Sequence, residues 1–433
     1  MPTLKLTKDG AAIKIGTRFE CSKTKRHVLH VRWAKNTSDL ILADHGLVWP
    51  QHQNGATRQA YARLAKELAS RGAIDAELEL GQPYHVASSE RPGSTPRKGL
   101  GKAAKRNRSE TGARFDVARI PRLQTWKGIP SQPTLVHADW SGSQASKRWY
   151  SIARWSSKQE KYVIAAPEPI AGDVASWLDE QLRISPLMLG FDFVNGLPRA
   201  YHPRKDFLAF LDHTKKMPLL LTKVRTLAEV GKDRPFFSGP GAKADMAQRI
   251  LGTTGDAALL LRFCDQAKSY RGAAEALFWC KYGKQVGSAT LHGWKNVVLP
   301  ARARGVALWP FDGASLPELL RRSKQVIVET YPGDAYSVLG VAGNSKREPS
   351  WRRKAGRRIL EVIQTEAFPI QLSAELRRMF GDGFGTDKEA EDRFDATVGA
   401  LLMALVAVGR RTPGLPSDPL VRNKEGWILG CDA

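Results

Sequence analysis

The chain has 433 residues, which is too long for one ordinary domain and long enough to bury a large core in two units. Its 42% hydrophobic and 25% charged residues exclude a wholly disordered protein. The 67 Lys and Arg residues exceed the 43 Asp and Glu residues and give a formal charge of +24, which favours a polyanionic partner such as DNA or RNA over a protein that needs charge only for solubility.

The cysteines and the apolar runs bear on location. Four cysteines lie far apart and form no C-x-x-C pair, so they predict neither a disulfide framework nor a zinc site and favour the reducing cytoplasm. They are Cys21, Cys264, Cys280 and Cys431. The first ten residues lack the apolar stretch of a secretory signal. The most apolar run, Phe394 to Gly409, is shorter than the ~20 residues that a bilayer requires, so we expect a buried helix and no membrane contact.

Residues 1–87 predict a small, basic α+β domain whose residues indicate no particular role. Segments TRFECS (17–22) and HVLHVRW (27–33) alternate as strands do, and Thr57 can cap a helix that ends at Gly72. Residues 88–114 then contain almost no large apolar side chain and are dense in Lys, Arg, Gly and Ser, which predicts a flexible basic linker. Such a segment is either an arm that grips phosphates or a solvated tether.

From residue 115 the pattern becomes α/β. Five strands are predicted, at 134–142, 147–156, 161–169, 186–196 and 325–332. Helices are predicted at 172–183 and 387–409, with a mostly helical insertion at about 199–322 that includes AALLLRFCDQA (257–267) and GAAEALFWCKY (272–282). The order is therefore a three-stranded meander, a helix, a strand, the insertion, a fifth strand and a closing helix.

Carboxylates recur at the key places of this pattern. Asp139 ends the first strand, Asp192 lies in the fourth, Glu329 ends the fifth, and Asp392 and Asp395 lie three residues apart on the closing helix, so they share a face. Mg²⁺ prefers such hard oxygen ligands, and two ions about 4 Å apart can activate water and stabilise the leaving oxygen of a phosphodiester. Each acid alone also fits a turn, a salt bridge or a helix N-terminus, so the prediction rests on the set.

We therefore predict Asp139, Asp192, Glu329 and Asp395 as catalytic, and Asp139, Asp192, Asp392 and Asp395 as ligands of two Mg²⁺ or Mn²⁺ ions. His137 precedes Asp139 by two residues on the same strand face and is a further candidate for contact with this site.

Basic residues near these acids are candidates for nucleic-acid binding. The run SWRRKAGRR (350–358) lies between Glu329 and the closing helix, where it could meet a strand of nucleic acid entering the acidic site. A solvated basic face would have the same sequence. The predicted set is Arg352, Arg353, Lys354 and Arg357 with Lys284 and Lys295 of the insertion.

The pieces HADWSG, GFDFVNGLPRA, VETYPGDAY and EDRFDATVGALLMAL together resemble the ribonuclease-H-like superfamily. More narrowly, they resemble its predicted-nuclease branch, domain-of-unknown-function family 429, over roughly 130–410. The resemblance implies a mixed five-stranded sheet with helices and an acidic metal site. It makes Asp139 the first-strand acid, Asp192 the fourth-strand acid and Asp392 or Asp395 the closing-helix acid, and it matches Glu329 to the acid of a Glu-x-Tyr-Pro strand end.

These observations favour a metal-dependent nuclease acting on DNA or RNA. One alternative is a non-catalytic nucleic-acid-binding protein that keeps the fold and retains the acids for structural reasons. Another is an ATP-using relative, because DWSGS (139–143) resembles the first phosphate loop of the sugar-kinase and actin group. That group needs a duplicated sheet, and only one copy is predicted here.

Overall fold

The computed structural model describes residues 131–432 apart from 202–205, 253–254, 269–270, 281–285 and 342–344, together with four strands near the N-terminus. The chain divides into two compact units, residues 1–106 and 107–433. In the first unit, β1 (Thr3–Leu4), β4 (Ala73–Glu79), β2 (Val28–Trp33) and β3 (Thr37–Ile41) form an antiparallel sheet in that spatial order. The predicted strand at 17–22, the helix from Thr57 to Gly72 and the linker at 88–114 lie outside the described residues.

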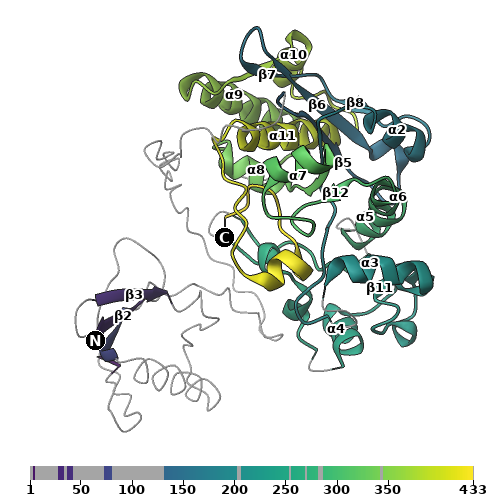
Figure 1. Ribbon diagram of the computed structural model, residues 1–433, viewed down its shortest axis with the longest axis vertical. Helices are drawn as coiled ribbons and strands as arrows, with labels where there is room; N and C mark the ends of the chain where they lie inside the picture. Colours follow the sequence, from purple (N-terminus) through teal and green to yellow (C-terminus); the bar gives the residue numbers. More distant parts are fainter. Residues whose placement is uncertain are drawn as a thin grey trace, which may run out of the picture. The chain divides into compact units, whose positions relative to one another are not determined.

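An eight-stranded mixed sheet forms the centre of the second unit (Figure 1). Its strands are β5 (Thr134–Asp139), β6 (Trp149–Ser156), β7 (Lys161–Ile164), β8 (Glu168–Pro169), β9 (Leu187–Phe191), β12 (Ala307–Leu308), β13 (Gln325–Glu329) and β14 (Ile370–Leu372). The spatial order is β12-β13-β9-β5-β6-β7-β14, with β8 beside β6. Strands β5, β6 and β7 are antiparallel neighbours, whereas β9, β13 and β12 run parallel to β5.

The predicted α/β class is confirmed, and the predicted strands are the central neighbours β13-β9-β5-β6-β7. The sheet has more strands than the five expected, because the predicted strand at 161–169 divides into β7 and β8, and β12 and β14 lie at the two edges. Strands β12 and β14 are only two or three residues long, too short to produce the alternation of apolar and polar residues by which strands are recognised.

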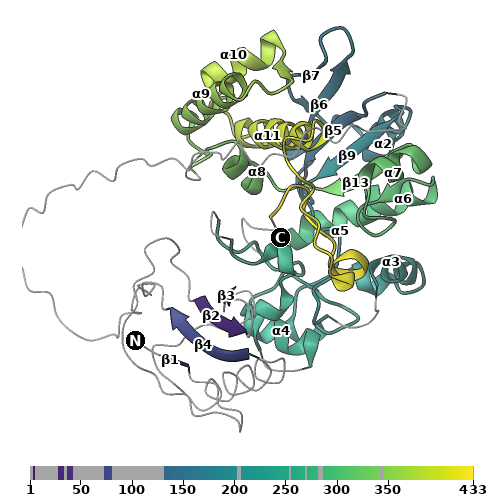
Figure 2. The same ribbon diagram turned by 60° about the vertical axis from the view of Figure 1, so that its left-hand side comes forward.

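Helices cover both faces of this sheet (Figure 2). The described helices of this unit are α2 (Val174–Gln181), α3 (Phe207–Lys216), α4 (Lys243–Leu251), α5 (Val286–Gly293), α6 (Leu299–Ala303), α7 (Leu316–Ser323), α8 (Pro332–Val338), α9 (Pro349–Thr365), α10 (Ala374–Asp382) and α11 (Ala390–Ala407), of which α3 to α6 lie in the insertion. One core cluster joins Leu135 and Met188 to α8, α9 and α11, and the other joins Val136 and Leu189 to α2 and the insertion. Successive strand residues thus face different helical layers.

Helix α11 confirms the predicted closing helix and packs mainly on β5 and β6. Two glycines allow its close approach to the sheet. A Cβ atom at Gly399 would lie 2.2 Å from the buried His137 ring, and one at Gly190 would lie 2.4 Å from Met403 Sδ. Such separations are shorter than real contacts between these atoms, so the small residues set the helix-to-sheet distance.

The insertion is less helical than predicted. Segment 257–267 forms two short 3₁₀ turns, Ala257–Leu260 and Phe263–Asp265, and residues 272–280 form no helix. The backbone of the latter segment pairs with β11 (Phe236–Phe237): Phe237 N donates to Phe278 O, and Cys280 N donates to Phe237 O. Burial of Leu277 and Phe278 next to β11 therefore outweighs the local helical pattern. Strand β11 also pairs in parallel with β10 (Lys223–Val224).

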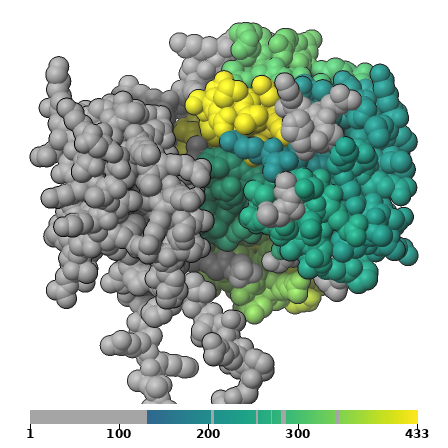
Figure 3. All heavy atoms as spheres, turned by 90° about the horizontal axis from the view of Figure 1, so that it is seen from below, coloured from purple at the N-terminus to yellow at the C-terminus, as the bar shows by residue number. Residues whose placement is uncertain are grey.

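Three further short 3₁₀ turns are described, at Ala145–Lys147, Pro218–Leu221 and Leu227–Glu229, and the π-helical segment Trp294–Val298 joins α5 to α6. The C-terminal segment, with a π-helical turn at Val421–Glu425, lies against the insertion (yellow beside teal in Figure 3). Lys424 Nζ donates to Arg199 O at 3.0 Å. Cys264, Cys280 and Cys431 are buried. Of the helices described, none has both the length and the apolar character needed to cross a membrane.

Candidate functional site

Two of the predicted acids meet where β5 and β9 end. These strands are parallel, and Ala138 of β5 is in register with Phe191 of β9, so Asp139 and Asp192 each lie one residue beyond that pair. The Asp192 carboxyl is hydrogen-bonded to that of Asp139, and it also accepts a hydrogen bond from the backbone N–H of Trp140 at 2.7 Å. The topology therefore brings together two carboxyls that are 53 positions apart in the sequence (192 − 139).

Burial and mutual repulsion change the acidity of this pair. Burial raises the pKa of Asp139 well above its usual range, and the nearby charges of Asp192, Asp395 and Asp392 raise it further. Burial also raises the pKa of Asp192 to about 7, against the lowering effect of its two hydrogen bonds. Two hydrogen-bonded carboxyls do not readily carry two negative charges together unless a cation is close. The pair therefore retains a proton near neutral pH.

Helix α11 adds the other two acids. Asp395 is buried, and its Oδ1 accepts a hydrogen bond from the Tyr336 hydroxyl of α8 while its Oδ2 contacts Lys346 Nζ. Asp392, one turn earlier, has a pKa raised to about 7, chiefly by burial. Its Oδ2 is buried and has no hydrogen-bond partner among the described residues.

The donor chemistry of this acidic cluster (Asp139, Asp192, Asp392 and Asp395) suits a hard divalent cation such as Mg²⁺ or Mn²⁺. The orphaned oxygen of Asp392 points the same way, because a buried carboxylate oxygen without a partner is costly unless a cation or proton satisfies it. The cluster is not a finished cage, however. Across the described residues, no three or more His, Cys, Asp or Glu side chains are gathered closely enough to hold a metal ion.

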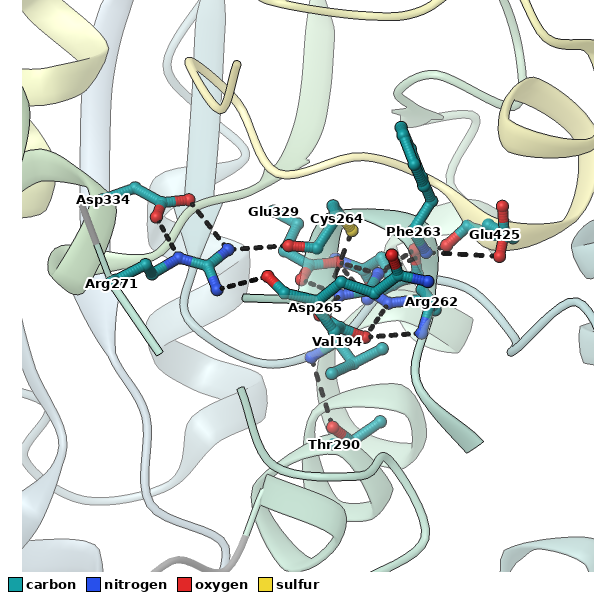
Figure 4. Close-up of polar contacts among 12 residues, drawn as sticks. Val194, Arg262, Phe263, Cys264, Asp265, Arg271, Thr290, Glu329, Asp334 and Glu425 are labelled. Atoms are coloured by element: carbon teal, nitrogen blue, oxygen red, sulfur yellow. Dashed lines mark hydrogen bonds and ion pairs between the residues drawn. The ribbon is translucent and has the colours of Figure 1, made fainter. Parts of the chain in front are cut away.

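The structure places Glu329 elsewhere, which does not support its predicted catalytic role. Its carboxylate forms a bidentate ion pair with the fully buried Arg262, at 2.7 and 2.5 Å, and accepts the backbone N–H of Asn195 at 2.6 Å (Figure 4). Arg262 is shared with Asp265 at 2.7 Å, so Glu329 belongs to a buried ionic network that ties the insertion to β13.

Strand parity explains this separation. Val326 and Val328 of β13 pack in the core cluster on the α11 side of the sheet, whereas Ile327 packs in the cluster on the insertion side. Alternation along a strand then directs Glu329 to the insertion side. The register agrees, because Glu329 pairs with Phe191 rather than aligning with Asp192. Glu329 is therefore aligned with the residue before Asp192, and its side chain lies on the opposite face of the sheet from the cluster.

The predicted basic set divides in three. Arg353, Lys354 and Arg357 are exposed on α9, and Lys295 is exposed in the π-helical segment Trp294–Val298. Arg352 is a wrong prediction for a surface contact, because it is 1% exposed and donates to the carbonyls of Gly383, Lys346 and Gly385. On α9 the Arg352 side chain lies on the buried face of the helix, whereas Arg353 and Lys354 lie on the exposed face. Lys284 lies outside the described residues.

His137 faces α11 from β5 and is fully buried. Its Nδ1 lies 3.0 Å from the carbonyl oxygen of Ala396, and its Nε2 has no partner among the described residues. Burial lowers its pKa to about 4, so the ring is neutral at pH 7 and Nδ1 acts as the donor to Ala396. The residue braces the helix that carries the acids.

Sequence reasoning missed two residues that contact the cluster. Lys346 Nζ contacts Asp395 and lies 3.0 Å from Glu391 Oε1. Tyr336 belongs to the segment VETYPGDAY, where one further turn of helix after Glu329 carries it to the α11 side. Lys346 comes from the connection between α8 and α9, which has no periodicity that would have indicated a role.

Comparison with protein-family models, with curated proteins and with solved structures finds no match to this chain.

Proposed function

We propose that the second unit is a metal-dependent nuclease of the ribonuclease-H-like type, which hydrolyses phosphodiester bonds in DNA or RNA with Mg²⁺ or Mn²⁺. The supporting observation is that acids from two neighbouring parallel strands and one helix interact electrostatically at one place in a strongly basic chain. A protein of charge +24 that concentrates buried acids in one place must offset their repulsion, and a bound cation would do so.

The ribonuclease-H-like assignment rests on the arrangement of these acids in the chain. The resemblance implies acids on the first strand, the fourth strand and the closing helix of the domain. Asp139, Asp192 and the Asp392–Asp395 pair come from β5, β9 and α11, which are those elements. The resemblance also implies a mixed five-stranded sheet, and the five predicted strands are central neighbours in the eight-stranded mixed sheet.

In this proposal each residue has a distinct task. Asp139 and Asp192 would lose their shared proton and bind the ion, and Asp392, whose Oδ2 has no described hydrogen-bond partner, would add negative charge beside it. A divalent ion supplies activation of water and charge neutralisation at the phosphodiester. Trp140, through its backbone N–H, fixes the orientation of Asp192. The exposed basic residues of α9 would attract the polyanion.

The test is cleavage of single- and double-stranded DNA and RNA in Mg²⁺ or Mn²⁺ by the wild type and by Asp139→Asn. The variant should lose activity by at least about 100-fold, since it removes a carboxylate that binds the ion. Asp212→Asn is the matched control, because Asp212 is an exposed acid of α3. Full activity in Asp139→Asn would refute the site.

One observation favours a second candidate function, a non-catalytic nucleic-acid-binding protein. The ammonium group of Lys346 already offsets part of the negative charge of Asp395 and Glu391, as a purely structural cluster would require. That protein would bind nucleic acid with strong salt dependence and cleave none of the substrates above.

A further inference from the structure

Arg148, which immediately precedes β6, is a buried cation without a counter-ion among the described residues. It is only 8% exposed. Its Nε donates to Ser141 O at 2.7 Å, and its Nη2 lies 3.1 Å from His292 Nε2. By contrast, Arg271, whose side chain is buried to a similar extent, forms an ion pair with Asp334. A buried guanidinium without an anion is costly, so Arg148 is suited to bind an anion from outside the chain.

The ring of His292 lies between two groups that can only donate hydrogen bonds. Its Nδ1 lies 3.3 Å from Trp140 Nε1, and its Nε2 lies next to Arg148 Nη2. Burial, together with the charge of Arg148, lowers the pKa of His292 to about 4, so at pH 7 the ring is neutral and has one N–H and one acceptor nitrogen. One of its two contacts is therefore a donor facing a donor. When Nδ1 accepts the indole N–H, the Nε2–H and the guanidinium are neighbouring donors that need a common acceptor.

The loop that follows β5 is packed closely against α5, which holds these donors in place. A Cβ atom at Gly142 would lie 2.1 Å from Ser288 O of α5, so only glycine allows this approach. The guanidinium carbon of Arg148 also lies 5.4 Å from the centre of the Trp140 ring, in a cation–π contact. A ligand that binds here therefore meets donors that are already ordered.

These donors lie beside the acidic cluster. Trp140, whose indole contacts the ring of His292, follows Asp139 directly in the chain. Its backbone N–H donates to Asp192 at 2.7 Å. An anion held by the two donors would therefore lie next to the carboxyls at the ends of β5 and β9.

We propose that Arg148 and His292 together bind one phosphate group of a DNA or RNA strand. One phosphate oxygen would accept hydrogen bonds from Arg148 Nη2 and from the Nε2–H of His292, which satisfies both donors and supplies the counter-ion of the arginine. The contact is made to the backbone of the strand, so it carries no sequence preference. This inference rests on the proposed function for the identity of the polyanion, but it requires no metal ion.

The experiment measures the binding of labelled single-stranded and duplex DNA and RNA to the full chain by fluorescence anisotropy, in EDTA and over a range of NaCl concentrations. Arg148→Gln should weaken binding at least about tenfold and lower the slope of log affinity against log salt concentration by about 0.7–0.9, the value for one phosphate contact. His292→Phe should weaken binding by about threefold without changing the slope, because the neutral ring contributes no charge. Arg154→Gln is the matched control, because Arg154 is an exposed arginine of β6, and its affinity should stay within about twofold of wild type.

Arg148→Lys serves as a second variant should Arg148→Gln fail to fold. It keeps the charge and therefore the slope, but it should lose at least about threefold in affinity, since lysine cannot contact the Ser141 carbonyl and the phosphate through one rigid fork. Circular dichroism checks the fold of each variant.

Wild-type affinity in the folded Arg148 variants or in His292→Phe would overturn the inference, and so would equal losses in Arg148→Gln and Arg154→Gln. Either result would leave the acidic cluster untouched, because no metal is present in the assay. Absence of binding to every one of these nucleic acids by the wild type would instead refute the proposed function itself.

Discussion

Burial of the Asp192 carboxyl costs folding free energy, which a cation at the proposed site would offset. Its pKa is raised to about 7, whereas the unfolded chain has 3.8, so the folded state disfavours the ionised carboxylate. The cost is absent below pH 4, grows between pH 4 and 7, and is constant above that. Asp192→Asn should therefore stabilise the metal-free protein by about 2 kcal/mol at pH 8 and leave its stability unchanged at pH 3.5. Urea unfolding in EDTA at several pH values measures this difference.

The control for Asp192→Asn is Asp212→Asn on α3, an exposed acid whose replacement should give no such pH-dependent gain. Asn can still accept the N–H of Trp140, so the loop at the end of β5 keeps its hydrogen bond. A variant less stable than wild type at pH 8 would show that the ionised Asp192 is structurally satisfied and does not await a cation.

Replacement of Glu329 should lower the stability of the protein, whereas replacement of Asp192 should raise it. Glu329→Gln leaves the guanidinium of Arg262 buried with one carboxylate fewer, which for a broken buried ion pair costs about 3–5 kcal/mol. Urea unfolding at pH 7 measures the loss, and Mn²⁺ affinity of the folded fraction should stay within about twofold of wild type. A large loss of Mn²⁺ affinity without loss of stability would return Glu329 to the metal site.

The site residues differ in how well their positions could be predicted from the sequence. Asp139 could be found because it ends an apolar strand, and Asp192 because it interrupts one; the parallel pairing of these strands brings the two together. Glu329 met the same criterion, yet strand parity sends it to the other face of the sheet. Arg352 sits among exposed basic neighbours, and only the helical phase separates it from them. A register error of one residue is enough to reverse a functional assignment.

At the scale of elements, the spacing between α11 and the sheet positions the acids. Gly399→Ala would place a methyl group 2.2 Å from the buried His137 ring and push the helix outward. We expect a loss of about 1–3 kcal/mol in the free energy of unfolding, as for other overpacked cores, and weaker Mn²⁺ binding because Asp392 and Asp395 move with the helix. Urea unfolding and calorimetry measure the two effects.

Gly381→Ala on α10 is the matched control, since no described atom lies within 4 Å of the position its Cβ would take. Alanine is the better helix former, so this variant should equal or exceed the wild type in stability. If Gly399→Ala and Gly381→Ala had the same free energy of unfolding, α11 could accommodate a methyl group against β5 without moving.

Elements with a strong periodic signal were predictable, and those set by tertiary contacts were not. The long strands β5, β6, β9 and β13 and the helix α11 carry continuous or alternating apolar residues. Segment 272–282 also has a helical pattern, but residues 272–280 form no helix and residues 278–280 pair with β11 instead. Strand β14 has only three residues. Its pairing with β7 and the burial of Ile370 and Leu372 in the core, rather than a pattern in its own sequence, make it a strand.

At the scale of the whole molecule, the excess of positive charge predicts salt-dependent nucleic-acid binding, and the structure narrows where to look for it. Arg353 and Arg357 lie one turn apart and exposed on α9, which continues from the connection that carries Lys346. A polyanion bound along this helix would lead toward the acidic cluster. Each phosphate contact contributes about 0.9 to the slope of log affinity against log salt concentration for duplex DNA.

The double variant Arg353→Gln/Arg357→Gln should therefore lower that slope by about 1–2, measured by fluorescence anisotropy with a labelled duplex between 50 and 300 mM NaCl in EDTA. Lys215→Gln/Lys216→Gln removes the same charge from α3, which lies at the other end of this unit in Figures 1 and 2, and should leave the slope unchanged. If both double variants lower the slope equally, the polyanion responds to net charge and α9 is not a docking surface. Because binding is measured without metal, the result stands whether or not the acidic cluster cleaves what α9 binds.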